Sequence, residues 1–335
     1  MAEIPIIDIR NISGDDFDNK LVSACYKALT KTGFFYLRQD IISNTLMKEL
    51  LEISNKYFNL PEDIKKNHFD SKLNRGYTGL KEETLDPENQ ILGDTKEGYY
   101  IGVDVTDENK INPEKFKGPN VYPTDKELPE FKTKVDEYIN KALILCRRLV
   151  VLIALTLKLP PHSLDENFTD PLAVLRLIRY SHEPSNVEEG VLGCGSHSDY
   201  GFITLLLTSM DPGLQVWSIE KEEWLDIEPL QNTFVVNIGD MLQRWSNGLY
   251  RSTLHRVVIS SSSSSSEYSS SESSISTNAS SSARLSAPFF FEPNYDTIIQ
   301  SLVKTNDGDS NKYPPIKSGE YLKAKYRQTH ADFEG

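Results

Sequence analysis

The chain has 335 residues, of which 38% are hydrophobic and 25% charged, as in an ordinary globular protein. Its 36 basic residues against 49 acidic ones give a formal net charge of −13, and no basic cluster offsets this balance. The charge disfavours nucleic acids and anionic membrane surfaces as partners, so we expect a small-molecule partner.

The cysteines are few: Cys25, Cys146 and Cys194 lie far apart and without CxxC spacing. This odd, sparse set argues against a disulfide framework and a cysteine-rich zinc site, and it predicts buried thiols in a reduced compartment. The N-terminus has no basic region followed by an apolar core, and the longest apolar run, residues 149–157, is too short to span a bilayer. We therefore expect a cytoplasmic protein, and we expect a monomer because nothing in the sequence indicates an obligate assembly.

The N-terminal third alternates short strands with amphipathic helices. In chain order, the patterns predict a strand at 4–9, a helix from 17 that Gly33 ends, a strand at 33–38, and a helix that begins at Ser43 and ends before Pro61. The stretch from 70 to 123 is rich in Gly, Asn, Asp and Pro, and we expect it to be irregular.

The remaining two thirds change from helix to strand. A long helical pattern over residues 126–157 predicts a helix that backs the main sheet. Short β runs follow after Pro160 and Pro161, at 173–180, 202–209, 214–219, 233–239, 252–260 and 284–291. Short strands at this spacing favour a sandwich or barrel-like β core. The end of the chain, residues 321–326, returns to helical or coil character.

A serine tract separates the last two of these strands. From Ser260 to Ser282, 16 of 23 residues are serine. Such a tract offers almost no apolar surface to offset the entropy of ordering it, so we expect a disordered insertion at a hairpin tip.

The chemistry of the chain centres on two of its six histidines. His197 and Asp199 are two residues apart, so on an extended strand both side chains point to one face. His255 lies in another strand pattern and adds a third ligand if that strand is a neighbour. Two histidines and one carboxylate are the ligand set of non-haem Fe(II) oxygenases, which leaves positions open for O2 and a cosubstrate. The pattern alone leaves zinc as an alternative.

A second pair of residues indicates an anion beside this metal site. Arg284 and Ser286 stand two residues apart in the β run that follows His255 in the sequence. A guanidinium fork and a hydroxyl together suit a carboxylate. A single exposed arginine at a strand start would be the ordinary interpretation, but the metal ligands before it and the apolar run after it favour an anion pocket.

Taken in order, these motifs resemble a family. The segments that carry the likeness are IPIIDI, TGFFYLR, KYFNLPEDIKK and DTKEGYYIG in the N-terminal part, followed by GCGSHSDYGFITLLL, GLQVWS, NIGDMLQRWSNGLYRSTLHRV and RLSAPFF. The chain resembles the Fe(II)/2-oxoglutarate-dependent dioxygenases, in the branch of isopenicillin N synthase (iron/ascorbate-dependent oxidoreductases), over nearly its whole length.

The resemblance implies roles for six residues. His197, Asp199 and His255 match the catalytic iron ligands, and Arg284 with Ser286 matches the pair that holds the distal carboxylate of 2-oxoglutarate. Tyr180 matches a tyrosine that joins this contact. The chain departs from the family at Ile178, where plant members often carry Asn, and in the interval of 29 positions from His255 to Arg284, where the family usually has a short turn.

The resemblance also implies a fold and a reaction. We expect a mainly β protein with flanking helices, whose double-stranded β-helix (jelly-roll) core is backed by the long helix. Residues 1–120 would form an N-terminal region and 121–335 the catalytic one. The implied activity uses Fe(II), O2 and 2-oxoglutarate, with ascorbate as reductant, to hydroxylate, desaturate or cyclise a small molecule.

Two alternatives stay open at this stage: an iron oxidase of the same fold that needs no 2-oxoglutarate, and a catalytically silent binding protein. The sequence does not identify the substrate. Tyr99, Tyr100 and Phe291 are our candidates for the pocket wall.

Overall fold

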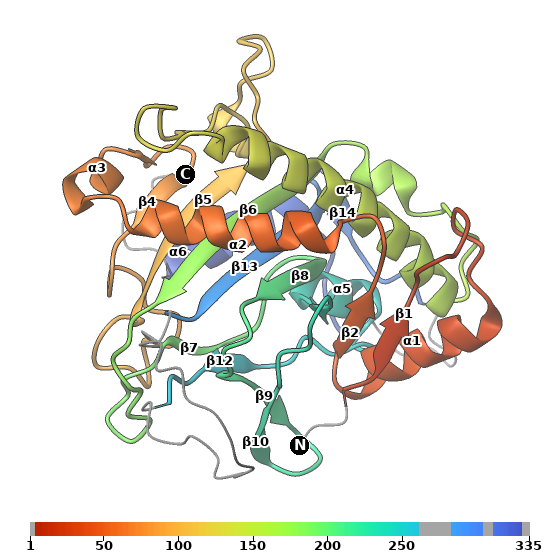
Figure 1. Ribbon diagram of the computed structural model, residues 1–335. Helices are drawn as coiled ribbons and strands as arrows, with labels where there is room; N and C mark the ends of the chain where they lie inside the picture. The colour runs from red at the N-terminus through yellow and green to blue at the C-terminus, as the bar shows by residue number, and fades with distance from the viewer. Residues whose placement is uncertain (1–3, 261–282, 304–310, 330–335) are drawn as a thin grey trace, which may run out of the picture.

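Strands from both halves of the chain join in one large sheet (Figure 1), in a computed structural model that describes residues 4–260, 283–303 and 311–329. Within these residues the sheet has nine strands, in the spatial order β1 (Ile6–Asp8), β2 (Phe34–Arg38), β11 (Phe234–Ile238), β8 (Ile203–Thr208), β13 (Leu285–Asn294), β6 (Pro171–Tyr180), β5 (Lys96–Gly102), β4 (Arg75–Thr78) and β3 (Phe69–Asp70). Neighbours pair antiparallel except β1 with β2. The N-terminal strands therefore extend both edges of the catalytic sheet.

A smaller sheet completes the core. Its four strands in the described chain are β10 (Glu223–Asp226), β9 (Leu214–Ser218), β12 (His255–Val257) and β7 (Cys194–His197), in that spatial order. A short pair, β14 (Ile298–Ile299) and β15 (Ile316–Lys317), lies near the end of the chain. The mainly β architecture with a large and a small sheet is the predicted jelly-roll core.

Helices cover one face of the large sheet (Figure 1). The two that cross it are α2 (Asn44–Phe58) and α4 (Phe131–Thr156), and α1 (Asn19–Lys31) packs against α4. Shorter elements are α3 (Glu62–Lys66), η1 (Pro113–Lys115), η2 (Asp165–Phe168), α5 (Asp240–Trp245) and α6 (Ser318–Thr329). The buried side of α4 carries apolar residues along nearly its full length, which confirms the predicted backing helix.

The predicted helix boundaries hold where a specific residue sets them. Ser43 caps α2 by accepting a hydrogen bond from the Leu46 amide at 3.1 Å. Gly33 follows α1 with a φ of 69°, a conformation that favours glycine. By contrast, α4 begins at Phe131 and not at 126, because Glu130 before it adopts a left-handed φ of 64°.

The prediction of an irregular stretch from 70 to 123 was wrong in part. Strands β4 and β5 lie within it, and all seven residues of β5 are buried. Lys96 and Glu97 obscured β5 in the sequence, because charged residues are rarely buried unless paired. Here Lys96 pairs with Glu83 at 2.8 Å and Glu97 with Lys65 at 2.6 Å.

Three further predictions concern the cysteines, the serine tract and membrane-spanning segments. The three cysteines are free and buried, as expected. Of the serine tract, residues 261–282 lie outside the described residues. Among the described helices, none combines the length and hydropathy that a membrane crossing requires.

Candidate active site

The end of β7 and the start of β12 bring two histidines together. The strands pair antiparallel with His255 opposite His197, and the two ring centroids are 4.3 Å apart. Asp199 follows β7 by two residues and its carboxylate turns toward both rings. One ligand atom from each of the three residues lies within 4.8 Å of the others, and no second such group exists in the part of the chain that the structure describes.

Main-chain carbonyls orient both imidazoles. The Nδ1 of His197 lies 2.8 Å from the Gly195 carbonyl oxygen, and the Nδ1 of His255 lies 3.1 Å from that of Thr253. A carbonyl only accepts, so each Nδ1 carries the proton and donates. Each Nε2 is thus left with a lone pair for a metal.

The third side chain, Asp199, is held in the same way. Thr204 and Asn237 both donate hydrogen bonds to its Oδ2, the latter at 2.6 Å. Its Oδ1 faces the Nε2 atoms of His197 and His255 at 3.8 and 3.6 Å. Burial opposes the charge, but the two rings and the two donors hold the pKa of Asp199 below its ordinary value.

The charges of this donor set fit a divalent transition metal. Burial, followed by the neighbouring His197, lowers the pKa of His255 to about 4, so its ring is neutral at physiological pH. Two imidazoles and one carboxylate, each with one atom facing a common point, match the donor set that binds non-haem Fe(II). The nearby Cys194 is not part of this group of ligand atoms, and burial raises the pKa of its thiol to about 12.

A buried arginine lies near this group. Arg284 is 6% exposed and stands over the ring of Tyr180, 4.6 Å from its centroid. Its Nε and Nη1 have no hydrogen-bond partner among the described residues. Ser286 lies beside it and donates to the Tyr180 hydroxyl at 3.4 Å. A buried guanidinium with unused donors, a hydroxyl and a phenol form a site for a carboxylate.

Arg284 and Ser286 reach this position from the larger sheet. Ser286 is on β13, which pairs with β8 and β6, whereas the neighbours of β12 are β7 and β9. The anion site therefore lies on a different sheet from the metal site, although the two segments follow each other in the sequence. This placement follows from the jelly-roll connection between the sheets.

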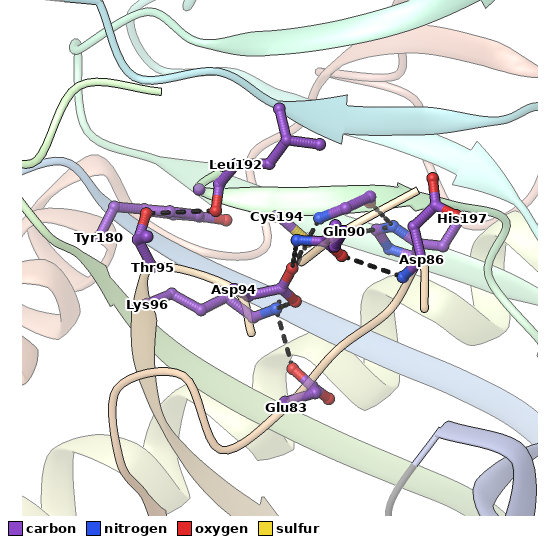
Figure 2. A network of polar contacts seen from close by, with 12 residues as sticks. Glu83, Asp86, Gln90, Asp94, Thr95, Lys96, Tyr180, Leu192, Cys194 and His197 are labelled. Carbon is purple, nitrogen blue, oxygen red and sulfur yellow. Dashed lines mark hydrogen bonds and ion pairs between the residues drawn. The ribbon is translucent and has the colours of Figure 1, made fainter. Parts of the chain in front are cut away.

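A buried polar network fixes β7 from the N-terminal side (Figure 2). Asp94 accepts hydrogen bonds from the Gly195 amide at 2.8 Å and from Gln90 at 2.9 Å. Lys96 pairs with Asp94 on one side and with Glu83 on the other. The segment from Glu83 to Lys96 thus holds the main chain of Gly195, whose carbonyl orients His197.

A cavity opens onto the metal site, and His197 and Asp199 are part of its wall. The rest of the wall combines aromatic and charged side chains, among them Tyr100, Tyr200, Tyr326, Phe290, Glu83, Arg176 and Glu292. The donor set therefore faces a space in which a small molecule can lie beside a bound metal.

Of the three predicted wall residues, only Tyr100 lines this cavity. Tyr99 is fully buried against Tyr57 and Phe131 in the core. Phe291 is also fully buried and stacks on Phe168 at 5.2 Å.

The alternation of β13 explains the error at Phe291. Residues separated by two share one face of a strand, so Ser286, Phe290 and Glu292 form one set. Glu292 was not predicted either, and its even spacing from Ser286 was the signal that identifies it. Burial, followed by the charge of Asp199, holds the pKa of Glu292 well above its ordinary value.

Family models match both parts of the chain. The 2OG-Fe(II) oxygenase superfamily matches residues 171–293, and the N-terminal family described as "non-haem dioxygenase in morphine synthesis N-terminal" matches residues 4–125.

Individual proteins extend this likeness over the whole chain. The chain is 31% identical to the 2-oxoglutarate-Fe(II) type oxidoreductase hxnY of Emericella nidulans, across 98% of this chain and 91% of that one. It is 32% identical to the homoarginine-6-hydroxylase 2-ODD-C23 of Glycine max, across 99% and 98%.

A solved structure is similar over the same extent. A full-length Neurospora crassa protein, crystallised in complex with alpha-KG and thymine, superposes with a TM-score of 0.77 at 28% identity, covering 97% of this chain and 96% of that one. The chain belongs to the 2OG-Fe(II) oxygenase superfamily, and it is an oxidoreductase that uses Fe(II) and 2-oxoglutarate to oxidise a small molecule.

Proposed function

We propose that His197, Asp199 and His255 hold the catalytic iron, and that Arg284, Ser286 and Tyr180 bind the distal carboxylate of 2-oxoglutarate. The two Nε2 atoms and the Asp199 Oδ1 that face one another support the first assignment. The unpartnered Nε and Nη1 of buried Arg284 support the second, and this observation carries the proposal because such a cation requires an anion.

Different residues would orient the iron ligands, the cosubstrate and the substrate. When bound, iron supplies the activation of O2 and the oxidative decarboxylation of 2-oxoglutarate. The Gly195 and Thr253 carbonyls keep the histidine lone pairs aimed at the metal, and Thr204 and Asn237 keep Asp199 ionised and in place. Arg284 fixes the position of the cosubstrate, and the cavity excludes bulk water and orients the substrate.

The most informative experiment measures succinate release and O2 uptake by the iron-loaded protein during turnover of an identified substrate. We expect the two in equal amounts, with a strict requirement for 2-oxoglutarate. Iron-dependent turnover without consumption of 2-oxoglutarate would instead establish an oxidase that uses iron alone. Absence of both turnover and iron binding would establish a silent binding protein.

Substitution of Arg284 tests the carboxylate assignment. We expect Arg284→Met to raise the KM for 2-oxoglutarate at least about thirtyfold, because loss of one partner of a buried charge pair costs about 2–5 kcal/mol. Arg284→Lys keeps the charge but loses the planar fork, so its KM should lie between those of Met and Arg. An unchanged KM in both variants would contradict the assignment.

Several finer properties complete the proposal. We propose hydroxylation as the outcome, which the homoarginine hydroxylase among the relatives supports. We further propose a cytoplasmic monomer that uses ascorbate to keep iron reduced and binds no nucleic acid; the net charge of −13 and the three free thiols support the compartment and the partner class. The division into residues 1–120 and 121–335 stays a proposal, supported by family matches at 4–125 and 171–293.

A further inference from the structure

One acidic side chain in the wall of the cavity has no hydrogen-bond or ion-pair partner among the described residues. Glu292 is 5% exposed and lines the cavity together with His197 and Asp199. No hydrogen bond or ion pair to its carboxyl exists among the described residues. Gly201 leaves room for this group, because a Cβ at that position would lie 2.4 Å from the Glu292 Oε1. The cavity thus contains a buried carboxyl that no residue of the described chain neutralises by an ion pair.

Two other charged side chains in the cavity wall, Glu83 and Arg176, are paired. Arg176 and Lys96 each lie 2.8 Å from the Glu83 carboxylate, and Lys96 also pairs with Asp94. The two positive and two negative charges of these side chains neutralise one another. The carboxyl of Glu292 takes part in no such pair among the described residues, so a bound cation would stabilise its charged form.

Another buried cation, Arg75, borders an adjoining cavity whose wall also includes Glu292. Arg75 donates to the main-chain carbonyls of Leu73 at 3.2 Å and Phe116 at 3.0 Å, and its Nε has no hydrogen-bond partner among the described residues. No ion pair joins Arg75 to Glu292 in the described chain, so the Glu292 carboxyl remains available to a ligand.

Aromatic rings surround the same space. Tyr100, Tyr200, Tyr326 and Phe290 line the cavity with Glu292. Ring faces attract cations, and a desolvated aromatic wall with one carboxylate is the arrangement that recognises ammonium and guanidinium groups. Arg176 already stands over the Tyr100 ring at 4.4 Å, so such contacts form here. The aromatic wall and the Glu292 carboxyl both favour a ligand with a positively charged nitrogen group.

We propose that Glu292 binds a positively charged nitrogen group of the substrate, such as a protonated amine, an amidinium or a guanidinium. The proposal rests on the proposed function, because it places that group in the cavity beside the iron ligands. Glu292 would act as a specificity-determining residue: it would fix one end of the substrate and leave a neighbouring C–H bond facing the metal.

Calorimetric titration of the anaerobic protein loaded with Fe(II) and 2-oxoglutarate tests this directly. The probes are benzylamine, benzyl alcohol and benzoate, which share one ring and differ in charge. We expect benzylamine to bind at least tenfold more tightly than benzyl alcohol, and benzoate to bind most weakly. Wild-type protein that binds the alcohol or the acid as tightly as the amine, or that binds none of the three, would overturn the proposal.

Variants then assign the preference to Glu292. The isosteric Glu292→Gln should reduce the preference for benzylamine over benzyl alcohol to within about twofold, whereas Glu292→Asp should keep part of it. Glu320→Gln removes the same charge outside the cavity wall and should leave the preference unchanged. A preference that persists in Glu292→Gln, or that Glu320→Gln also abolishes, would contradict the assignment.

The same titrations separate this inference from the proposed function. Binding of 2-oxoglutarate to each variant is measured before the probe is added, and Glu292→Gln should bind it as the wild type does. Failure of the wild type to bind 2-oxoglutarate would count against the cosubstrate site and not against Glu292. Loss of 2-oxoglutarate binding in Glu292→Gln alone would show a structural role and overturn the inference.

Discussion

Single hydrogen bonds fix the orientation of the three side chains that we propose as iron ligands. The Nδ1 of each histidine donates a hydrogen bond to the main-chain carbonyl two residues before it. The Oδ2 of Asp199 accepts hydrogen bonds from two neutral side chains, Thr204 and Asn237. These hydrogen bonds fix each side chain so that the remaining atoms, the two histidine Nε2 atoms and the Asp199 Oδ1, face one another. Residues that touch no metal therefore set its binding site in advance.

A substitution of Asn237 tests this preorganisation. We expect Asn237→Ala to weaken Fe(II) binding about 10–100-fold, because Asp199 would lose one of its two side-chain donors and part of its fixed orientation. The measurement is equilibrium Fe(II) titration of the apoprotein under anaerobic conditions, with thermal unfolding as the control for folding. Iron affinity equal to that of the wild type would show that Thr204 alone positions the carboxylate.

The sequence predicted some of these residues and not others, for physical reasons. His197 and Asp199 could be found because the spacing of two survives in any extended segment. Phe290 and Glu292 were missed in favour of Phe291, because an apolar run by itself does not reveal which face of a strand meets a cavity. Counting in steps of two from Ser286, which the sequence had already assigned to the site, identifies that face.

At the scale of elements, the small sheet depends on a segment from the other half of the chain. Asp94 holds the Gly195 amide, and Gly195 precedes His197 by two residues on β7. This contact spans about a hundred residues of sequence and lies in a buried region, where a charge-assisted hydrogen bond is stronger than at a surface.

Substitution of Asp94 should therefore weaken iron binding without touching a ligand. We expect Asp94→Asn to lower the affinity for Fe(II) about tenfold, because Gly195 and Lys96 would both lose an anionic partner. Asp86→Asn is the matched control, since the Asp86 carboxylate accepts from exposed Asn89. Both affinities come from the same anaerobic titration. An effect of equal size in the two variants would contradict the coupling through Gly195.

The junction of α1 with β2 offers a test of stability. Gly33 has a φ of 69°, and a Cβ there would lie 2.0 Å from the Arg251 carbonyl oxygen. Gly14 has a similar φ of 56° with nothing within 4 Å. We expect Gly33→Ala to lower the free energy of unfolding by about 3 kcal/mol or more, and Gly14→Ala by about 1–2 kcal/mol. Urea denaturation measures both, and equal losses would show that the steric overlap with Arg251 relaxes.

Helices could be predicted from the sequence where the spacing of apolar residues and the residues at the helix ends indicated the same boundaries. The helices α1 and α2 follow from an apolar stripe with Gly33 and Ser43 at their ends. Strand β5 was not predicted because its charged residues are also neutralised by Glu83 and Lys65, which lie 13 and 32 residues away in the sequence, and local patterns do not encode such pairs. The polar network that holds β7 was not predicted either, because it joins residues that are far apart in the sequence.

At the scale of the whole molecule, the site is assembled from both sheets and both halves of the chain. The small sheet supplies the two histidines, the large sheet supplies Ser286 and Tyr180, and the N-terminal half supplies Tyr100 and Glu83. The cavity thus forms only when long-range pairing is complete. Its family could be predicted from the ordered motifs, whereas its wall required the three-dimensional arrangement.

The most direct test of the account locates the metal itself. Crystals of the protein prepared anaerobically with Fe(II) and 2-oxoglutarate should give one dominant anomalous difference peak at the iron absorption edge. We predict this peak within bonding distance of the His197 Nε2, Asp199 Oδ1 and His255 Nε2 atoms, with 2-oxoglutarate density extending to Arg284. A dominant peak at any other place, or a cosubstrate that does not contact Arg284, would contradict the account.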